Sequence, residues 1–222
     1  MRYVELGSCG LTSSVLGFGC GSVMGRAGRK RSLRALEAAY DSGITFFDTA
    51  RSYGYGESES VVGEFLQQRR DRVVLSTKFG IVAAPQPAWK QVLKPVVRAI
   101  LDAAPATRRL VRGYVKAQFK ENHPTPALLH KSLDESLRKL GTDYVDILFI
   151  HSAPASVLAQ CDLLESLGEL ITCGKIRVAG ISGDPGVIRT ALSRKADPLK
   201  AMQFPTNIFD LTLMGEIGLA RN

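Results

Sequence analysis

Five largely apolar runs along the chain are each followed at once by a polar residue. Continuous apolar runs that alternate with helical stretches are typical of buried parallel strands. If such a sheet closes into a barrel, the residues that follow its strands gather at the carboxyl-terminal rim, where barrels of this class keep their active sites. The pattern therefore predicts a rim lined by polar side chains. The runs lie at 44–47, 73–77, 145–150, 176–181 and 199–202, and the residues after them are Asp48, Lys78, His151, Ser182 and Gln203.

Periodicity and end signals predict the remaining elements. Thr125 is suited to cap a helix whose first residue is Pro126, and Gly141 is suited to end it. A short hairpin is expected within residues 1–16. Strands are predicted at 14–18, 44–47, 72–77, 144–150, 175–181 and 199–204, and helices at 32–42, 57–68, 126–140, 155–173 and 185–195.

The expected fold is an α/β barrel of the TIM (β/α)8 type that is incomplete. A closed barrel of this class has eight strands and typically ~250 residues, whereas the pattern supplies about six strand–helix units. The tail from Thr206 to Asn222 is too short for two more units. We therefore expect strands seven and eight to be missing, which would leave the first and sixth strands as open edges with unpaired backbone groups.

One segment, 79–123, is far longer than the ~2–6 residues usual between a strand and the next helix. Helices are predicted within it at 89–103 and 107–119. We therefore expect a single domain over residues 1–222, with a basic helical insertion at about 81–122. The insertion contains Asp102 and Glu121 against eight basic residues, Lys90, Lys94, Arg98, Arg108, Arg109, Arg112, Lys116 and Lys120.

The insertion accounts for most of the net charge of +8. The charge is either a solvated face or a field that steers anionic ligands toward the rim. A nucleic-acid partner is not expected, because no recognised motif accompanies the charge. A membrane partner is not expected either, because no apolar stretch approaches ~20 residues and the N-terminus lacks a signal-peptide core.

Cysteine and histidine usage bears on compartment and metal. The cysteines are Cys9, Cys20, Cys161 and Cys173, and their spacing shows no CxxC pair and no disulfide framework. Free thiols in a reducing cytoplasm are therefore expected. A metal site is not expected, since three scattered histidines and unclustered cysteines do not supply ligand spacing.

Three stretches resemble the aldo/keto reductase family. The most specific is Phe46-Phe47-Asp48-Thr49-Ala50-Arg51-Ser52-Tyr53-Gly54, which is similar to the family's aspartate-and-tyrosine signature; the others lie at 133–151 and 174–182. The resemblance covers nearly the whole chain. It implies a catalytic tetrad of Asp48, Tyr53, Lys78 and His151, and an NADPH-dependent reduction of a small-molecule carbonyl compound.

The chemistry of these residue types agrees with those roles. Hydride transfer to a carbonyl leaves an alkoxide, so a proton donor must stand beside the oxygen. A free tyrosine has a pKa near ~10; a neighbouring lysine ammonium would lower it, and a buried aspartate would hold that ammonium in place. A histidine can hydrogen-bond the same oxygen and orient the substrate.

The cofactor side departs from the family pattern. The resemblance implies that Ser182 and Gln203 hold the nicotinamide carboxamide, that Gly19 and Cys20 lie near the ribose, and that Asn207 matches a frequent family residue. Where the family has Ser-Asn, however, this chain has Ser182-Gly183. The family's aromatic of strand seven and its phosphate-binding residues after strands seven and eight are not found. A truncated product, a barrel completed by a partner or by self-association through the open edges, and a natural short variant are all open explanations.

Three functions are compatible with the sequence. The first is an NADPH-dependent oxidoreductase that reduces an aldehyde or ketone to the alcohol, with Tyr53 as proton donor. The second is a non-catalytic or degenerate relative that lacks full cofactor binding. The third is an aldolase-like barrel in which Lys78 forms a Schiff base.

Overall fold

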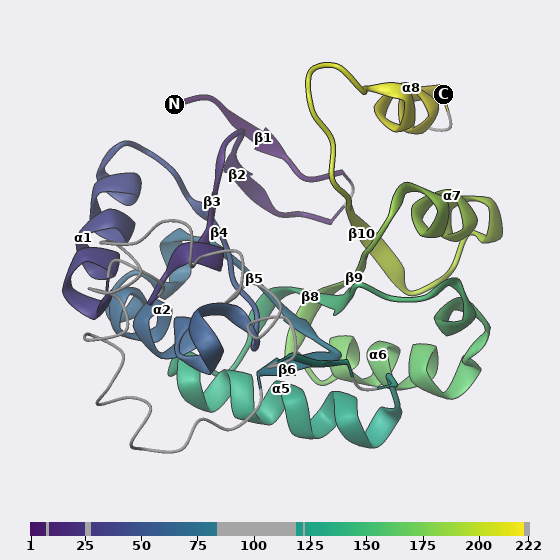
Figure 1. Cartoon of the computed structure of the whole chain (residues 1–222), viewed down its shortest axis with the longest axis horizontal. Helices are drawn as coiled ribbons and strands as arrows, with labels where there is room; N and C mark the ends of the chain where they lie inside the picture. The colour runs from purple at the N-terminus through teal and green to yellow at the C-terminus, as the bar shows by residue number, and fades with distance from the viewer. Residues whose placement is uncertain (8, 25–27, 84–118, 122, 220–222) are drawn as a thin grey trace, which may run out of the picture.

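The computed structural model describes residues 1–7, 9–24, 28–83, 119–121 and 123–219. Its centre is one six-stranded parallel sheet with strand order β10-β9-β8-β5-β4-β3, which curls into a half-barrel (Figure 1). Each strand except the first follows a helical segment, as the alternating pattern predicts. The strands are β3 (Gly17–Gly19), β4 (Phe46–Asp48), β5 (Val74–Phe79), β8 (Val145–His151), β9 (Ile176–Ser182) and β10 (Leu199–Gln203).

Helices lie around the outer side of this sheet, in chain order from α1 to α7 (Figure 1). Two antiparallel pairs stand apart from it, β1 with β2 and β6 with β7. The helices are α1 (Gly28–Asp41), α2 (Ser58–Leu66), α5 (Pro126–Leu140), α6 (Cys161–Thr172), α7 (Pro185–Arg194) and α8 (Thr212–Leu219). The short elements are β1 (Tyr3–Glu5), β2 (Thr12–Ser14), β6 (Ile81–Ala83), β7 (Phe119–Glu121) and the 3₁₀ turns η1 (Cys20–Ser22), η2 (Tyr53–Gly56), η3 (Arg70–Arg72) and η5 (Ala155–Ala159).

Helix α5 shows how the sequence specifies its elements. The Thr125 hydroxyl accepts a hydrogen bond from the Leu128 amide at 3.2 Å, and Pro126 occupies the first turn. Gly141 ends the helix in the left-handed conformation, at a φ of 63°, and its amide donates to the Leu137 carbonyl. The apolar stripe Leu129, Leu133, Leu137 and Leu140 is buried, as predicted.

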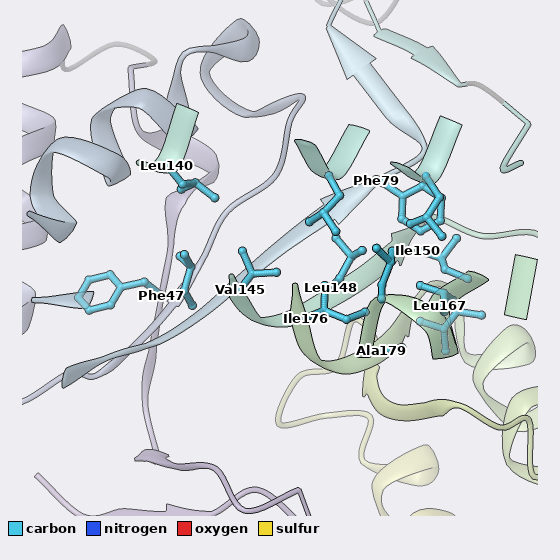
Figure 2. Packing of buried hydrophobic residues seen from close by; sticks show 14 of the residues in the cluster. Phe47, Phe79, Leu140, Val145, Leu148, Ile150, Leu167, Ile176 and Ala179 are labelled. Carbon is cyan, nitrogen blue, oxygen red and sulfur yellow. The ribbon is translucent and has the colours of Figure 1, made fainter. Parts of the chain in front are cut away.

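The sheet has an apolar core on each face, because successive side chains of a strand point to opposite sides. The outer core lies between the sheet and the helices, and Figure 2 shows Leu148, Ile150 and Ala179 in it. The inner core fills the half-barrel and contains Leu11, from the loop of the β1–β2 hairpin. Its buried members are Leu11, Val74, Ile147, Phe149 and Val178.

Several predicted boundaries are wrong for identifiable reasons. The first strand, predicted at 14–18, is divided into β2 and β3. The prediction missed this division because Val15 and Leu16 are apolar, as buried strand residues are, although they are 42% and 60% exposed. The helix predicted at 155–173 is divided into η5 and α6 at Gln160, whose ψ of 86° is not helical. Helix α1 begins four residues before its predicted start. The prediction missed this first turn because the residues in it include no apolar side chain that could mark a helical period. Helix α8 was not anticipated.

Strand β5 runs two residues further than predicted, so Lys78 lies inside the strand instead of following it. The helix predicted at 89–103 and most of the one at 107–119 lie outside the described residues, while Phe119 begins strand β7. The expectation that strands seven and eight are missing is not confirmed. No helix among the described residues is both long enough and apolar enough to cross a membrane.

Candidate active site at the carboxyl ends of the strands

Lys78 and Asp48 form a buried ion pair inside the half-barrel. The Lys78 Nζ lies 2.6 Å from each carboxylate oxygen of Asp48 and 3.1 Å from the carbonyl oxygen of Thr49. The Lys78 side chain is 1% exposed and that of Asp48 is 14% exposed. Three oxygen acceptors surround the ammonium, so its burial is compensated by charge-assisted hydrogen bonds.

The Asp48 carboxylate is held by two further donors. The Ser76 hydroxyl donates to Oδ1 at 2.6 Å, and the Gln203 amide donates to Oδ2 at 3.2 Å. Ser76 and Lys78 are two residues apart in β5, so they point to the same face of the sheet. The carboxylate, which is carried by β4, is therefore held in place by donors from β5 and β10.

Tyr53 lies next to this pair. It begins turn η2, five residues after Asp48, and the Lys78 Nζ stands 4.9 Å from the centroid of its ring. The Tyr53 ring also meets the imidazole of His151 edge-on, with ring centroids 6.0 Å apart and an interplanar angle of 87°. The structure thus brings together all four residues of the expected tetrad.

His151 is held neutral by its surroundings. Burial, followed by the charge of Lys78, lowers the pKa of His151 to about 4 against the opposing charge of Asp48. Its Nδ1 atom is buried and has no hydrogen-bond partner among the residues that the structure describes. At neutral pH the imidazole therefore has one N–H donor and one lone-pair acceptor.

The expected carboxamide-binding residues adjoin the tetrad. His151, Ser182 and Gln203 are neighbours in the register of β8, β9 and β10. The Ser182 hydroxyl donates to the Gln203 Oε1 at 3.0 Å, and the Gln203 amide in turn reaches Asp48. A Cβ added at Gly183 would lie 3.5 Å from both the Ala153 carbonyl oxygen and the Val187 Cβ, which is ordinary contact.

The other three candidate cofactor residues differ in position. Gly19 is exposed and pairs with Asp48 in the sheet register. Cys20 is fully buried, side chain and backbone alike, and burial followed by the charge of Asp48 raises the pKa of its thiol to about 12. Asn207 lies in an exposed turn, where its Oδ1 accepts from the Phe209 amide at 2.9 Å, and none of the contacts described for it places it with the other candidates.

Sequence reasoning missed the polar groups on the helix side of the site. Thr77, next to Lys78, faces the helices, and its hydroxyl donates to the Glu59 Oε1 at 2.8 Å. Glu59 is 1% exposed, and burial raises its pKa against opposing effects of hydrogen bonds and of Arg51 and Lys139. A glutamate within an otherwise apolar helix face, at 58–66, was the available signal for its burial.

The chain matches the sequence model of the Aldo/keto reductase family over residues 15–214. It is 29% identical over 216 residues to aldo-keto reductase YhdN of Bacillus subtilis (strain 168), covering 95% of this chain and 55% of the relative. It is 27% identical over 187 residues to aryl-alcohol dehydrogenase (NADP(+)) of Phanerodontia chrysosporium, covering 80% of this chain and 42% of the relative.

A solved structure agrees with these matches. The fold is similar to that of the holo form of aldo-keto reductase AKR11C1 from Bacillus halodurans, with a TM-score of 0.76 and 26% identity, covering 100% of this chain and 63% of that chain. The chain spans about half the length of the curated relatives it matches. Since the family match extends over nearly the whole chain, the chain belongs to the aldo/keto reductase family.

Proposed function

We propose that this chain carries the reaction centre of an NADP-dependent oxidoreductase that reduces a small aldehyde or ketone to the alcohol. The observation that carries the proposal is the buried Lys78–Asp48 pair, whose ammonium lies 4.9 Å from the ring centroid of Tyr53. Carbonyl reduction needs a proton donor beside a fixed positive charge, and this arrangement supplies both.

Tyr53 is the proton donor in this proposal. Its phenolic hydroxyl can donate a proton, and the Lys78 Nζ lies 4.9 Å from the centroid of its ring. Asp48 holds the Lys78 side chain in place through contacts of 2.6 Å to both of its carboxylate oxygens. The developing alkoxide takes the phenolic proton, and the phenolate that remains is stabilised by the same ammonium.

His151 orients the carbonyl oxygen. Because the pKa of His151 is lowered to about 4, the ring is neutral at pH 7 and does not compete with Tyr53 as a strong acid. A neutral imidazole can still donate one hydrogen bond to the carbonyl oxygen. Its edge-on contact with Tyr53 keeps the two polar side chains near the same point.

Ser182 and Gln203 fit a nicotinamide carboxamide. A hydroxyl and a primary amide at the ends of adjacent strands offer donors and acceptors that match an amide group. When bound, the nicotinamide supplies the hydride. The name of one relative supports NADP as the nucleotide, since it is an NADP(+) aryl-alcohol dehydrogenase.

The test is an NADPH titration of this chain followed by cofactor fluorescence, and then assays with a panel of aldehydes and ketones. We expect Tyr53→Phe to keep its NADPH affinity and to lose about 10²- to 10⁴-fold in kcat. Tyr55→Phe, two residues away in the same turn, is the matched control. Turnover unchanged in Tyr53→Phe would contradict the proposal.

Absence of NADPH binding in a cooperatively folding sample would instead favour a non-catalytic relative. Gly183 is the observation that motivates this second candidate, since no side-chain amide is present there. The Schiff-base alternative is not favoured, because three oxygen acceptors within 3.1 Å already engage the Lys78 nitrogen. Borohydride trapping of a carbonyl compound on Lys78 would revive it.

A further inference from the structure

One face of helix α5 contacts the loop that carries Tyr53. The loop runs from the end of β4 to the start of α2. Ser132 and Glu135 contact it before Tyr53, and Lys139 contacts it after Tyr53. These three residues recur every three or four positions, so they lie along one side of the helix.

The first contact is made by Arg51, two residues before Tyr53. Its Nη1 donates to the Ser132 hydroxyl at 3.1 Å and to the Ser132 carbonyl at 3.4 Å. Its Nη2 forms an ion pair with the Glu135 carboxylate. The Arg51 side chain is 8% exposed, so the guanidinium is largely withdrawn from water and depends on these partners. The planar fork of arginine allows the two partners to be held at once.

The second contact is made by Lys139, one further turn along α5. Its Nζ donates to the Gly56 carbonyl at 2.8 Å, three residues after Tyr53. The backbone between the two contacts is not regular helix, since Gly54 and Tyr55 have φ values of 59° and 58°. A side chain at Gly54 would meet the Val23 carbonyl at 2.5 Å. The loop thus has an unusual conformation, and the contacts with α5 add to its own backbone hydrogen bonds, from Tyr53 to Ala50 and from Glu57 to Gly54.

We propose that Arg51, Ser132, Glu135 and Lys139 form a clamp that positions Tyr53 over Lys78. None of the four touches the Lys78–Asp48 pair in the described contacts, so they are positioning residues. The clamp lies on the helix side of the sheet, whereas Lys78, Asp48 and His151 face the inside. Groups on both sides of the sheet therefore act on Tyr53, and in this proposal the contacts with α5 set the position of its hydroxyl.

Glu135→Gln is the direct test, with Asp134→Asn as the matched control. Asp134 is the adjacent residue of α5, and its carboxylate pairs with Lys175 on the surface at 2.7 Å. Each substitution removes one carboxylate charge from the same helix turn. We expect Glu135→Gln, but not Asp134→Asn, to shift the NMR signals of the Tyr53 ring, assigned with Tyr53→Phe in ¹³C-tyrosine-labelled protein.

The kinetic arm of the test rests on the proposed function. A displacement of ~1 Å in a reacting group can cost about 100-fold in rate, so we expect Glu135→Gln and Arg51→Lys to lower kcat by tenfold or more. The KM for NADPH should stay within twofold, because Ser182 and Gln203 are untouched. A general loss of structure would raise KM and lower the melting temperature together.

The two proposals can fail separately. If the unaltered chain turns over no carbonyl compound, the proposed function fails, while the Tyr53 ring signals still decide the role of the clamp. Ring signals that are the same in Glu135→Gln and the unaltered chain would overturn the clamp. Equal shifts in Glu135→Gln and Asp134→Asn would overturn it as well, since the effect would then follow charge alone.

Discussion

Thr77 and Lys78 are neighbours in β5, and their side chains point to opposite faces of the sheet. Lys78 points inward to Asp48, and Thr77 points outward to Glu59. Both partners are acidic, yet their surroundings differ. Asp48 accepts from Lys78, Ser76 and Gln203, whereas the Glu59 Oε2 has no hydrogen-bond partner within the described parts of the chain and its pKa is raised by burial. The two carboxylates thus differ in how many donors reach them from the surrounding strands and helices.

Protonation of His151 makes the free energy of unfolding depend on pH in the acid range. Its folded pKa of about 4 lies below the ordinary 6.5, mainly through burial. The unfolded chain therefore binds a proton between pH 6.5 and 4 that the folded chain does not bind. Stability from this residue is complete above pH 6.5 and falls as the pH drops toward 4. Allowing for the partial exposure of the ring, we expect a loss on the order of 2 kcal/mol.

Urea unfolding followed by circular dichroism at pH 7 and pH 4.5 measures this loss. The difference between the two pH values should be smaller in His151→Gln than in the unaltered chain. The exposed His123 supplies the control substitution, His123→Gln, which should leave the difference unchanged. An equal pH dependence in His151→Gln would show that the ring is accessible to protons in the fold.

At the scale of elements, a third acidic residue, Asp146, joins the strands at the opposite end of the sheet. The Asp146 carboxylate, on β8, is 1% exposed and accepts from the Leu75 amide of β5 at 2.9 Å. It pairs with Arg70 at 2.8 Å and with Arg177 of β9 at 3.1 Å. The two guanidinium groups also stand over the ring of Tyr144, at 3.9 and 4.7 Å from its centroid. One carboxylate therefore ties three strands and turn η3 together.

We expect Asp146→Asn to lower the free energy of unfolding by about 3 kcal/mol, because loss of a buried partner leaves charges uncompensated. Denaturant titration at pH 7 measures the change. Asp134→Asn, which breaks an exposed ion pair, should cost less than ~1 kcal/mol. A cost for Asp146→Asn no larger than that of the control would show that Arg70 and Arg177 find other partners.

These elements show what periodicity can and cannot predict. The order of strands and helices follows the chain's apolar pattern, and α5 has both predicted end signals, Thr125 and Gly141. The division of β2 from β3 was missed, because Val15 and Leu16 are apolar but exposed. Contacts between elements were missed for a different reason: Arg51 and Glu135 are 84 residues apart, and no local pattern links them.

At the scale of the whole molecule, a residue from outside the parallel sheet helps to fill the half-barrel. Its inner core is closed at the end opposite the site by Leu11, which is 4% exposed and packs with Val74, Ile147 and Val178. The hairpin that carries Leu11 lies outside the parallel sheet (Figure 1). Burial of this side chain joins the first residues of the chain to three central strands.

We expect Leu11→Ala to cost about 2–5 kcal/mol in the free energy of unfolding, because it leaves a cavity among strands that cannot collapse fully. Leu16→Ala removes the same atoms from a side chain that is 60% exposed, and it should cost less than ~0.5 kcal/mol. Thermal and urea unfolding of the two variants measure the difference. Similar costs would mean that the hairpin is not part of the cooperative core.

The sequence by itself determined the parallel α/β architecture and the residues that meet at one edge of it. Asp48, Lys78, His151, Ser182 and Gln203 were identified from their places at strand ends, because parallel strands bring those ends together. Only the tertiary structure decided how the side chains pair. Lys78 meets Asp48 across 30 residues and Gln203 meets Asp48 across 155, and α5 holds the Tyr53 loop from the helix side. Such contacts depend on chain segments packed in three dimensions, and local periodicity carries no record of them.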